Sequence, residues 1–263
     1  MSRLPALILG GWALLALGGW VLPLTPDAID LERLFAAPLS KGYLFGGDEL
    51  GRSVAERLAA GAGISLLVAV VSVSLSAVIG TVIGVLAGYL GGWADRVVSR
   101  LIEVFLAFPG LLLAIALVAF LGPGIDNAVI ALSAMGWVGY ARLSRNQVLS
   151  LRHREHVLAA VALGRAPPAI MAYHLLPLLL APLLVEASFG LASAVIAEAG
   201  LSFLGLGVQP PQASWGSMIR EGVRYLLVAP ALGAGTRDRA VAGGAGCQRA
   251  GRWAARSPGC HFT

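Results

Sequence analysis

The stretch from Ile64 to Tyr89 contains no charged side chain, and it constrains the fold more than any other feature of this sequence. A helix rises about 1.5 Å per residue, so a stretch of this length exceeds the roughly 30 Å of hydrocarbon in a bilayer. The whole chain shares this character: 13% of its residues are charged, against about 25% in soluble domains, and its mean hydropathy is +0.81. The sequence therefore predicts an integral membrane protein, and 263 residues leave room for about five or six spans.

Apolar runs predict five spanning helices and hence an all-α, polytopic helical bundle. Their expected ranges are 7–22, 64–89, 98–121, 128–140 and 174–197. The first is expected to be a retained helix and not a cleaved signal, because no small-residue cleavage site follows it. Within the third, Pro109 is expected to kink the helix, since proline removes one backbone hydrogen bond.

Small side chains recur at every fourth position of the second expected span, at Ser72, Ser76, Gly80, Gly84 and Gly88. In lipid such a stripe lets helix backbones approach closely, because packing drives helix association there. The stripe therefore predicts a helix-packing face, and a pore-lining stripe is the alternative.

Two acidic residues fall in the expected fifth span, Glu186 inside it and Glu198 near its end. A carboxylate exposed to lipid is costly, so Glu186 is expected to face the bundle interior or a wet cavity. Earlier in the chain, Asp48 is expected to cap a helix that begins near Leu50, by accepting hydrogen bonds from free backbone N–H groups.

Loop arginines predict the orientation of the chain in the membrane. Residues 142–173 contain five arginines and one acid, and residues 91–100 contain two arginines. We expect both segments, with the N-terminus, on the cytoplasmic side. Residues 25–60 are net acidic and residues 121–127 contain no basic side chain, so these two segments and the glycine-rich loop from Leu201 are expected outside. The net charge of +5 is then explained by arginines at the membrane surface and not by a nucleic-acid partner.

No pattern in the sequence predicts catalysis by this chain. A phosphate-binding loop needs G-x-x-x-x-G-K-[ST], and the only lysine, Lys41, follows a serine. ATP hydrolysis is therefore expected on a separate subunit, and no cofactor is expected here. His153 and His156 are three residues apart in a basic loop, but no set of partner ligands accompanies them, so no metal site is expected. No nucleophile–base pair is visible either, which argues against a membrane enzyme.

Four blocks of the sequence resemble the inner-membrane permease subunits of ATP-binding-cassette importers: residues 46–53 (GGDELGRS), 87–117, 139–157 and 198–219. The similarity is to the branch that takes up dipeptides, oligopeptides and nickel, and within it to the second permease of the pair. It implies a type I importer permease fold in the bacterial inner (cytoplasmic) membrane. The signature residues of the branch that this chain keeps are Asp48, Gly51, Arg52, Glu198, Ser202, Gly205, Gly207, Pro210, Trp215 and Gly216.

Residues 155–177 are expected to form a short helix, a break at Gly164, Pro167 and Pro168, and a second helix, which together make a compact element protruding on one side of the membrane. The resemblance further implies that the short helix in the 142–173 loop docks on the ATPase subunit. Leu158 stands where the family usually has a glutamate, so docking is expected to depend on apolar packing and on the flanking charged residues. The residues expected to form this ATPase-coupling loop are Arg152, Arg154, Glu155, Leu158, Ala159, Ala160, Gly164, His174 and Pro177.

The implied assembly contains a homologous permease subunit, two ATPase subunits that bind ATP and Mg, and a periplasmic substrate-binding protein. Its implied activity is import of dipeptides or oligopeptides. A nickel importer is the alternative within the family, because the sequence V-L-A at 157–159 resembles nickel-type permeases. An ion-coupled secondary transporter is the alternative from another class. It would predict internal repeats around a midplane site, and the sequence shows no such repeat.

The expected division of the chain is an N-terminal transmembrane helix (1–24), a periplasmic segment (25–60), a permease core (61–232) and a tail (233–263). The family continues with a sixth span, whereas this tail contains five arginines and no apolar run long enough to cross a membrane. Reading the codons from Thr236 one base later, with suitable third bases, yields an apolar run and the family's ending. A disordered cytoplasmic tail is one explanation, but after five spans the tail would end outside, against the positive-inside trend. We therefore hypothesise a frameshift near Leu232 to Thr236, either a sequencing error or a real lesion, by which the sixth span is lost. Cys247 and Cys260 lie in this tail and predict no disulfide framework.

Overall fold

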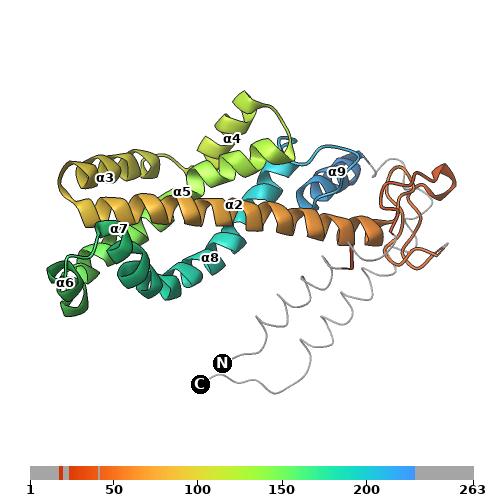
Figure 1. Ribbon diagram of the computed structural model, residues 1–263. Coiled ribbons are helices and arrows are strands. Elements are labelled where there is room, and N and C mark those ends of the chain that lie inside the picture. The colour runs from red at the N-terminus through yellow and green to blue at the C-terminus, as the bar shows by residue number, and fades with distance from the viewer. Residues whose placement is uncertain (1–17, 20–23, 41, 229–263) are drawn as a thin grey trace, which may run out of the picture. The chain divides into compact units, whose positions relative to one another are not determined.

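A computed structural model describes residues 18–19, 24–40 and 42–228 (Figure 1). Nearly all of the first expected span and the whole of the 233–263 tail, with its expected frameshift, lie outside the described residues. The chain divides into two compact units, Met1–Ile219 and Arg220–Thr263. The fold below is that of the first unit. Of the second unit, the structure describes only the last part of one helix.

The described chain is helical, with two isolated β-bridges and no strand among the described residues, which confirms the all-α prediction. The elements are η1 (Leu31–Arg33), α2 (Val54–Leu90), α3 (Gly92–Leu106), α4 (Gly110–Leu121), α5 (Ile125–Leu151), α6 (Glu155–Ala162), α7 (Pro167–Ile170), η2 (Met171–Leu175), α8 (Leu176–Phe203) and α9 (Trp215–Val228).

Helix α2 is the central element of the first unit, packing along α5 and also contacting α8 and α3 (Figure 1). It begins at Val54, inside the segment expected to be periplasmic, and its 37 residues correspond to about 55 Å. The helix therefore extends well beyond the hydrocarbon of a bilayer. Ser53 caps it by accepting a hydrogen bond from the Glu56 N–H, and Gly91 ends it with a φ of 68°.

The expected third span is two helices and not one kinked helix. Helices α3 and α4 meet at an angle of 88°, so the prediction of a continuous helix over 98–121 is wrong. Pro109 lacks an N–H and disfavours helical backbone at Phe108. Together these two effects end α3, and α4 begins as a new helix after Pro109. Residues 91–100, which lie between the second and third expected spans, are helical from Gly92 on, because α3 starts directly after a sharp glycine bend.

Among the residues that the structure describes, two helical segments are long and apolar enough to cross a membrane: α2 and the continuous run Pro167–Phe203. The bent pair α3–α4 makes a third if it is one broken span. Helix α5, which contains Asp126, Arg142 and Arg145, is not among them. The described residues therefore leave the predicted count of five spans unconfirmed.

The segment from Glu155 to Pro177 has the expected order of short helix, glycine, prolines and helix. Gly164 adopts a φ of 73° after α6, and Pro167 and Pro168 begin α7. Prolines are tolerated there because the first N–H groups of a helix have no intrahelical acceptor. Five residues with π-helical bonding, η2, join α7 to α8, so the expected 174–197 span is longer at both ends.

Candidate functional site

The small-residue stripe of α2 lies against α5. A Cβ atom on Gly80 would collide with the carbonyl oxygen of Trp137, and one on Gly84 would collide with that of Ala141. One turn before Gly80, the Ser76 hydroxyl donates to the Ser133 carbonyl over 3.3 Å. The two backbones are thus close enough that only small residues fit between them. All five residues of the stripe are buried, namely Ser72, Ser76, Gly80, Gly84 and Gly88.

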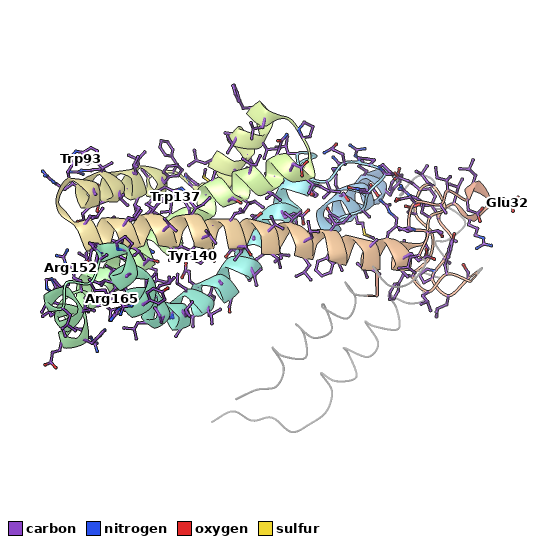
Figure 2. All side chains as sticks on the ribbon, in the orientation of Figure 1. Glu32, Trp93, Trp137, Tyr140, Arg152 and Arg165 are labelled. Carbon is purple, nitrogen blue, oxygen red and sulfur yellow. The ribbon has the colours of Figure 1, made fainter. Side chains whose placement is uncertain are left out.

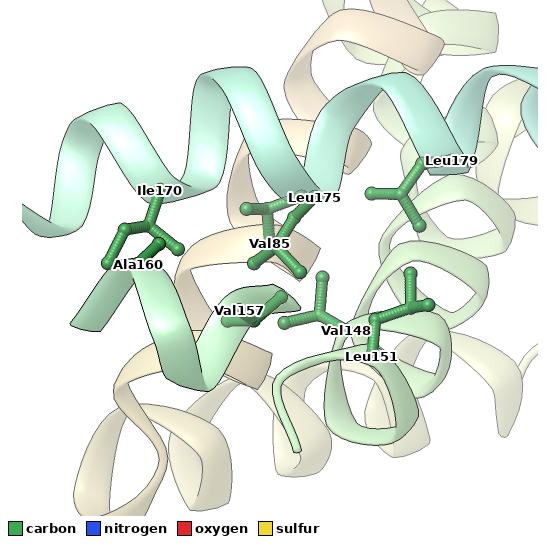
Figure 3. Packing of buried hydrophobic residues seen from close by; sticks show 8 residues of the cluster. All are labelled: Val85, Val148, Leu151, Val157, Ala160, Ile170, Leu175 and Leu179. Atoms are coloured by element: carbon green, nitrogen blue, oxygen red, sulfur yellow. The ribbon is translucent and has the colours of Figure 1, made fainter. Parts of the chain in front are cut away.

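Helix α6, at the start of the 155–177 segment, has one buried face and one exposed face. Val157 and Ala160 are buried against the ends of α2, α5 and α8, in a cluster with Val85, Val148 and Leu175 (Figure 3). On the other face, Leu158 and Val161 are 51% and 50% exposed, and Leu163, just after the helix, is 87% exposed. The short helix is therefore anchored to the bundle while an apolar surface remains uncovered.

Two polar contacts connect this end of α5 to neighbouring helices. The Arg145 guanidinium donates Nη2–H to Asp95 Oδ2 of α3 over 2.8 Å and also pairs its Nε with Oδ1. The Arg152 Nη1 donates to the Gly88 carbonyl of α2 over 3.1 Å. Figure 2 shows Arg152 at the end of the bundle that carries α6 and α7. These contacts connect the end of α5 to α3 and to α2.

The other residues expected in the coupling loop surround α6. Arg154 precedes its first turn without a side-chain cap, and Glu155 is exposed. His174 is partly buried in η2, and Pro177 is exposed in the first turn of α8. Arg165 lies over the ring of Tyr173, 5.4 Å from its centroid. The structure thus brings the predicted residues to one end of the bundle.

Glu198 joins three segments at the opposite end of the spans. It is 1% exposed, and its Oε2 accepts a hydrogen bond from Ser65 of α2 over 2.8 Å. Its Oε1 accepts from Ser202 over 2.7 Å, and the Ser202 Oγ in turn accepts from the Val208 N–H of the following loop. Sequence reasoning singled out Glu198 and Ser202 but missed Ser65, because no local pattern marks a partner 133 residues away.

The remaining signature residues set the path of the loop after α8. Gly205 has a φ of 84°, and a Cβ on Gly207 would collide with the Ser202 hydroxyl. Trp215 donates its indole N–H to the Leu58 carbonyl over 3.2 Å, and a Cβ on Gly216 would collide with the Ala199 carbonyl. Pro210, in this loop, is joined to Pro211 by a cis peptide bond. The loop after α8 is therefore held against α2 and α8.

Contacts also group the loops as the arginine count predicts. The Gly124 N–H donates to Leu206 O over 3.2 Å, so the 121–127 turn lies beside the glycine-rich loop. Residues 95 and 145, both in segments expected on the cytoplasmic side, are joined by the ion pair described above. Which of these groups faces the cytoplasm stays a prediction.

Asp48 does not cap a helix, so that prediction is wrong. Its Oδ1 accepts hydrogen bonds from the N–H groups of Leu50 and Arg52, at 2.9 and 2.8 Å, and thereby closes a turn ahead of α2. Its Oδ2 pairs with Arg52 Nε and with Nη1 of the buried Arg57, at 2.7 and 2.6 Å. Gly51 adopts a φ of 71° where a Cβ would collide with the Asp30 carbonyl. Sequence reasoning missed Arg57, although it lies only nine residues beyond Asp48.

Asp48→Asn is expected to lower the free energy of unfolding by about 2 kcal/mol at pH 7, because it removes the charge from these hydrogen bonds. Burial raises the pKa of Asp48, but the two backbone N–H donors and Arg52 outweigh burial, and the pKa lies below its ordinary 3.8. An acid whose pKa is lower in the folded protein than in the unfolded chain stabilises the fold at pH values above its unfolded pKa. This stabilisation is lost as the pH falls through the folded pKa. The destabilisation by D48N should therefore shrink below about pH 3.8. Thermal unfolding in detergent measures it.

Asp27→Asn is the matched control, because Asp27 is exposed, and it should leave the melting temperature unchanged. A D48N protein as stable as the D27N protein at pH 7 would show that the Asp48 turn does not stabilise this segment.

A cavity of about 300 Å³ lies between α2, α4, α5 and α8. Glu186 lines it, as expected for a carboxylate turned toward the bundle interior. Tyr140 lines it too, and Figure 2 shows this residue in the middle of the bundle. The described residues contain no group of three His, Cys, Asp or Glu side chains arranged to hold a metal ion.

Sequence comparisons agree with the resemblance. The profile of the family described as "Binding-protein-dependent transport system inner membrane component" matches residues 80–235. The dipeptide transport system permease protein DppC of Alkalihalophilus pseudofirmus is 41% identical over 191 residues, which is 73% of this chain and 63% of that protein. The match thus spans less than two thirds of that relative. The di/tripeptide transport system permease protein DppC of Pseudomonas aeruginosa is 40% identical over 79% of this chain and 70% of its own length.

Two further comparisons point the same way. The glutathione transport system permease protein GsiD of Escherichia coli O157:H7 is 40% identical over 80% of this chain and 70% of its own length. Among solved structures, an inward-facing form of the MetNI methionine ABC transporter superposes with a TM-score of 0.52 at 25% identity. That superposition covers 71% of this chain and 95% of the transporter chain.

Proposed function

This chain belongs to the family of binding-protein-dependent transport system inner membrane components, and from this membership we propose that it is a permease subunit of an ATP-driven importer of dipeptides or oligopeptides. Its place is the bacterial inner membrane, as a multi-pass protein. A homologous permease, two ATPase subunits and a periplasmic substrate-binding protein complete the assembly. ATP and Mg bind to the ATPase subunits and not to this chain.

The two-faced helix α6 carries this proposal. One face is built into the cluster that joins the ends of α2, α5 and α8, the other exposes Leu158 and Val161, and Leu163 is exposed just after the helix. An apolar surface on such a short helix needs a partner, because exposed apolar patches on otherwise polar loops mark interaction sites. The ATPase subunit is that partner. Apolar contacts replace the salt bridge that the family's usual glutamate would make.

The contacts around α6 suggest how docking moves the spans. When ATP binding closes the ATPase pair, α6 moves with it. The displacement reaches α2 and α5 through the cluster around Val157. It reaches α3 as well, because α5 is joined to α2 by the Arg152–Gly88 contact and to α3 by the Arg145–Asp95 ion pair. The spans then shift between inward and outward access, because ATP favours one of two states of the assembly.

The proposed cargo follows the names of the relatives, which are dipeptide, di/tripeptide and glutathione permeases. The nickel alternative rested on the V-L-A sequence at 157–159, and these residues lie in α6, at the end of the bundle and away from the cavity. Peptide is therefore the cargo we propose.

Cysteine crosslinking tests the docking directly. In a background where Cys247 and Cys260 are serine, Leu163→Cys is expected to crosslink to the ATPase subunit through a short thiol–amine reagent, because Leu163 is 87% exposed beside α6. Ile29→Cys, which is also exposed but lies in the segment expected outside, is the matched control and should give no ATPase adduct. Mass spectrometry of the adducts identifies the partner. An ATPase adduct at residue 29 and none at residue 163 would contradict the proposal.

A further inference from the structure

Two polar side chains, one on α5 and one on α8, line the same cavity, and neither has an evident role in stabilising the fold. The hydroxyl of Tyr140 is buried, with the residue 3% exposed, and it has no hydrogen-bond partner among the described residues. The carboxylate of Glu186, on α8, has no hydrogen bond or ion pair within the described part of the chain. Buried polar groups in native proteins are nearly always paired, so the unpaired Tyr140 hydroxyl beside the partly buried Glu186 carboxylate needs an explanation.

Glycines on both helices make room for these two groups. A Cβ on Gly139 of α5 would lie 2.8 Å from Glu186 Oε1, so the carboxylate rests on the α5 backbone beside Tyr140. A Cβ on Gly190 of α8 would lie 2.6 Å from the Tyr140 hydroxyl, so the hydroxyl rests on the α8 backbone one turn after Glu186. Each helix thus supplies one polar side chain and one glycine, and each glycine leaves room for the polar side chain of the other helix.

The rest of the cavity favours a small cation. Ser72, Ser76 and Ser193 are among its lining residues beside apolar side chains, and none of the described lining residues is basic. The Ser72 hydroxyl, like that of Tyr140, has no partner among the described residues. One carboxylate surrounded by neutral oxygens complements an ammonium group, which donates three hydrogen bonds and carries one positive charge. A single carboxylate is a poor site for a divalent metal ion, which needs several charged or nitrogen ligands.

We propose that this cavity binds the N-terminal ammonium group of a peptide, with Glu186 as its counter-ion and Tyr140 and Ser72 as hydrogen-bond partners. The inference rests on the proposed function. The cavity volume of about 300 Å³ is at the lower end for ligand sites, which suits the amino end of a peptide and not its whole length. Because every peptide with a free N-terminus carries this group, the site accepts cargo of varied sequence.

The test has two readouts on the complete importer assembly. The first is ATP-driven uptake of dialanine by proteoliposomes that also contain the binding protein. The second is retention of radiolabelled dialanine amide, which has an ammonium group and no carboxylate, by the detergent-solubilised assembly without the binding protein. Glu186→Gln is expected to weaken retention at least about tenfold and Tyr140→Phe to weaken it less, because a charge-assisted hydrogen bond contributes more than a neutral one.

Glu103→Gln is the matched control: it makes the same change at an exposed carboxylate on α3 and should retain the probe like the wild type. N-acetyl-dialanine amide, which lacks the ammonium group, should not compete. Equal retention by E186Q and wild type, competition by the acetylated probe, or no retention by the wild type would each overturn the inference.

If E186Q does not assemble, Gly190→Ala replaces it, because its Cβ would crowd the Tyr140 hydroxyl and leave the carboxylate in place. Unchanged retention by G190A would then overturn the inference.

The two readouts also separate the proposed cavity site from the proposed function. Wild-type uptake with retention independent of Glu186 refutes the site alone, whereas retention that depends on Glu186 without any ATP-driven uptake refutes the proposed function and leaves the site.

Discussion

Gly84→Leu is expected to prevent the chain from folding into a stable bundle. A Cβ at this position would already collide with the Ala141 carbonyl and lie 2.9 Å from the Ser144 Cβ. Both contacts belong to α5, which packs along the length of α2, so the larger side chain must force the two helices apart. Overpacking ordinarily costs about 1–3 kcal/mol. Here the obstruction is backbone, which has no rotamer to change, and we expect a loss of more than about 3 kcal/mol.

Alanine substitutions give the matched comparison. Gly84→Ala should still destabilise, because its one added carbon is the one that collides. Gly200→Ala, in α8, meets nothing within 4 Å and should stabilise by about 0.5–1 kcal/mol, since alanine favours helix over glycine. Thermal unfolding in detergent, followed by size-exclusion chromatography, measures all three variants. A Gly84→Leu protein that elutes and melts like the wild type would show that α2 and α5 do not pack through this stripe.

Features with a local signal in the sequence were predicted well. The apolar run of α2 and its small-residue period are visible without any partner, and the α2–α5 contact explains the period. The interior position of Glu186 follows from the cost of a carboxylate in lipid alone. The helix–glycine–proline–helix order of 155–177 follows from local backbone preferences of glycine and proline.

Features set by competition between residues or by distant contacts were not predicted. Asp48 and Ser53 are both good caps, but only Ser53 directly precedes α2 and caps it, whereas the Asp48 carboxylate is engaged by Arg52 and Arg57 in the turn before. The break before α4 was read as a kink, because proline in a membrane helix permits either outcome. The ion pair between Asp95 and Arg145 joins residues fifty positions apart, which no spacing rule in the sequence reveals.

Leu158→Lys is expected to reduce ATP-driven uptake strongly while leaving the chain folded. Leu158 is on the exposed face of α6, so a lysine there extends into solvent and costs the isolated chain little. In the assembly the same lysine would bring an unpaired charge into an apolar contact. Loss of one central contact residue commonly weakens an interface by about 2 kcal/mol or more, so we expect uptake to fall at least about tenfold.

Two companion variants make this result specific. Leu158→Ala shortens the side chain without adding charge and should reduce uptake less than lysine does. Leu31→Lys makes the same change at an exposed leucine in the segment expected outside, and it should leave uptake unchanged. The melting temperatures of all three should match the wild type. If L158K and L31K transport equally well, then α6 is not the surface through which the chain is driven.

The central claim is that this chain moves its cargo only when a separate ATPase acts on α6. Proteoliposomes containing both permeases, with and without the ATPase subunits, test it most directly when peptide uptake is measured with ATP and, separately, with an imposed proton gradient. We predict ATP-driven uptake only when the ATPase subunits are present, its strong reduction in Leu158→Lys, and no uptake on the gradient alone. Uptake that persists on the gradient after the ATPase subunits are omitted would contradict the claim and identify an ion-coupled transporter instead.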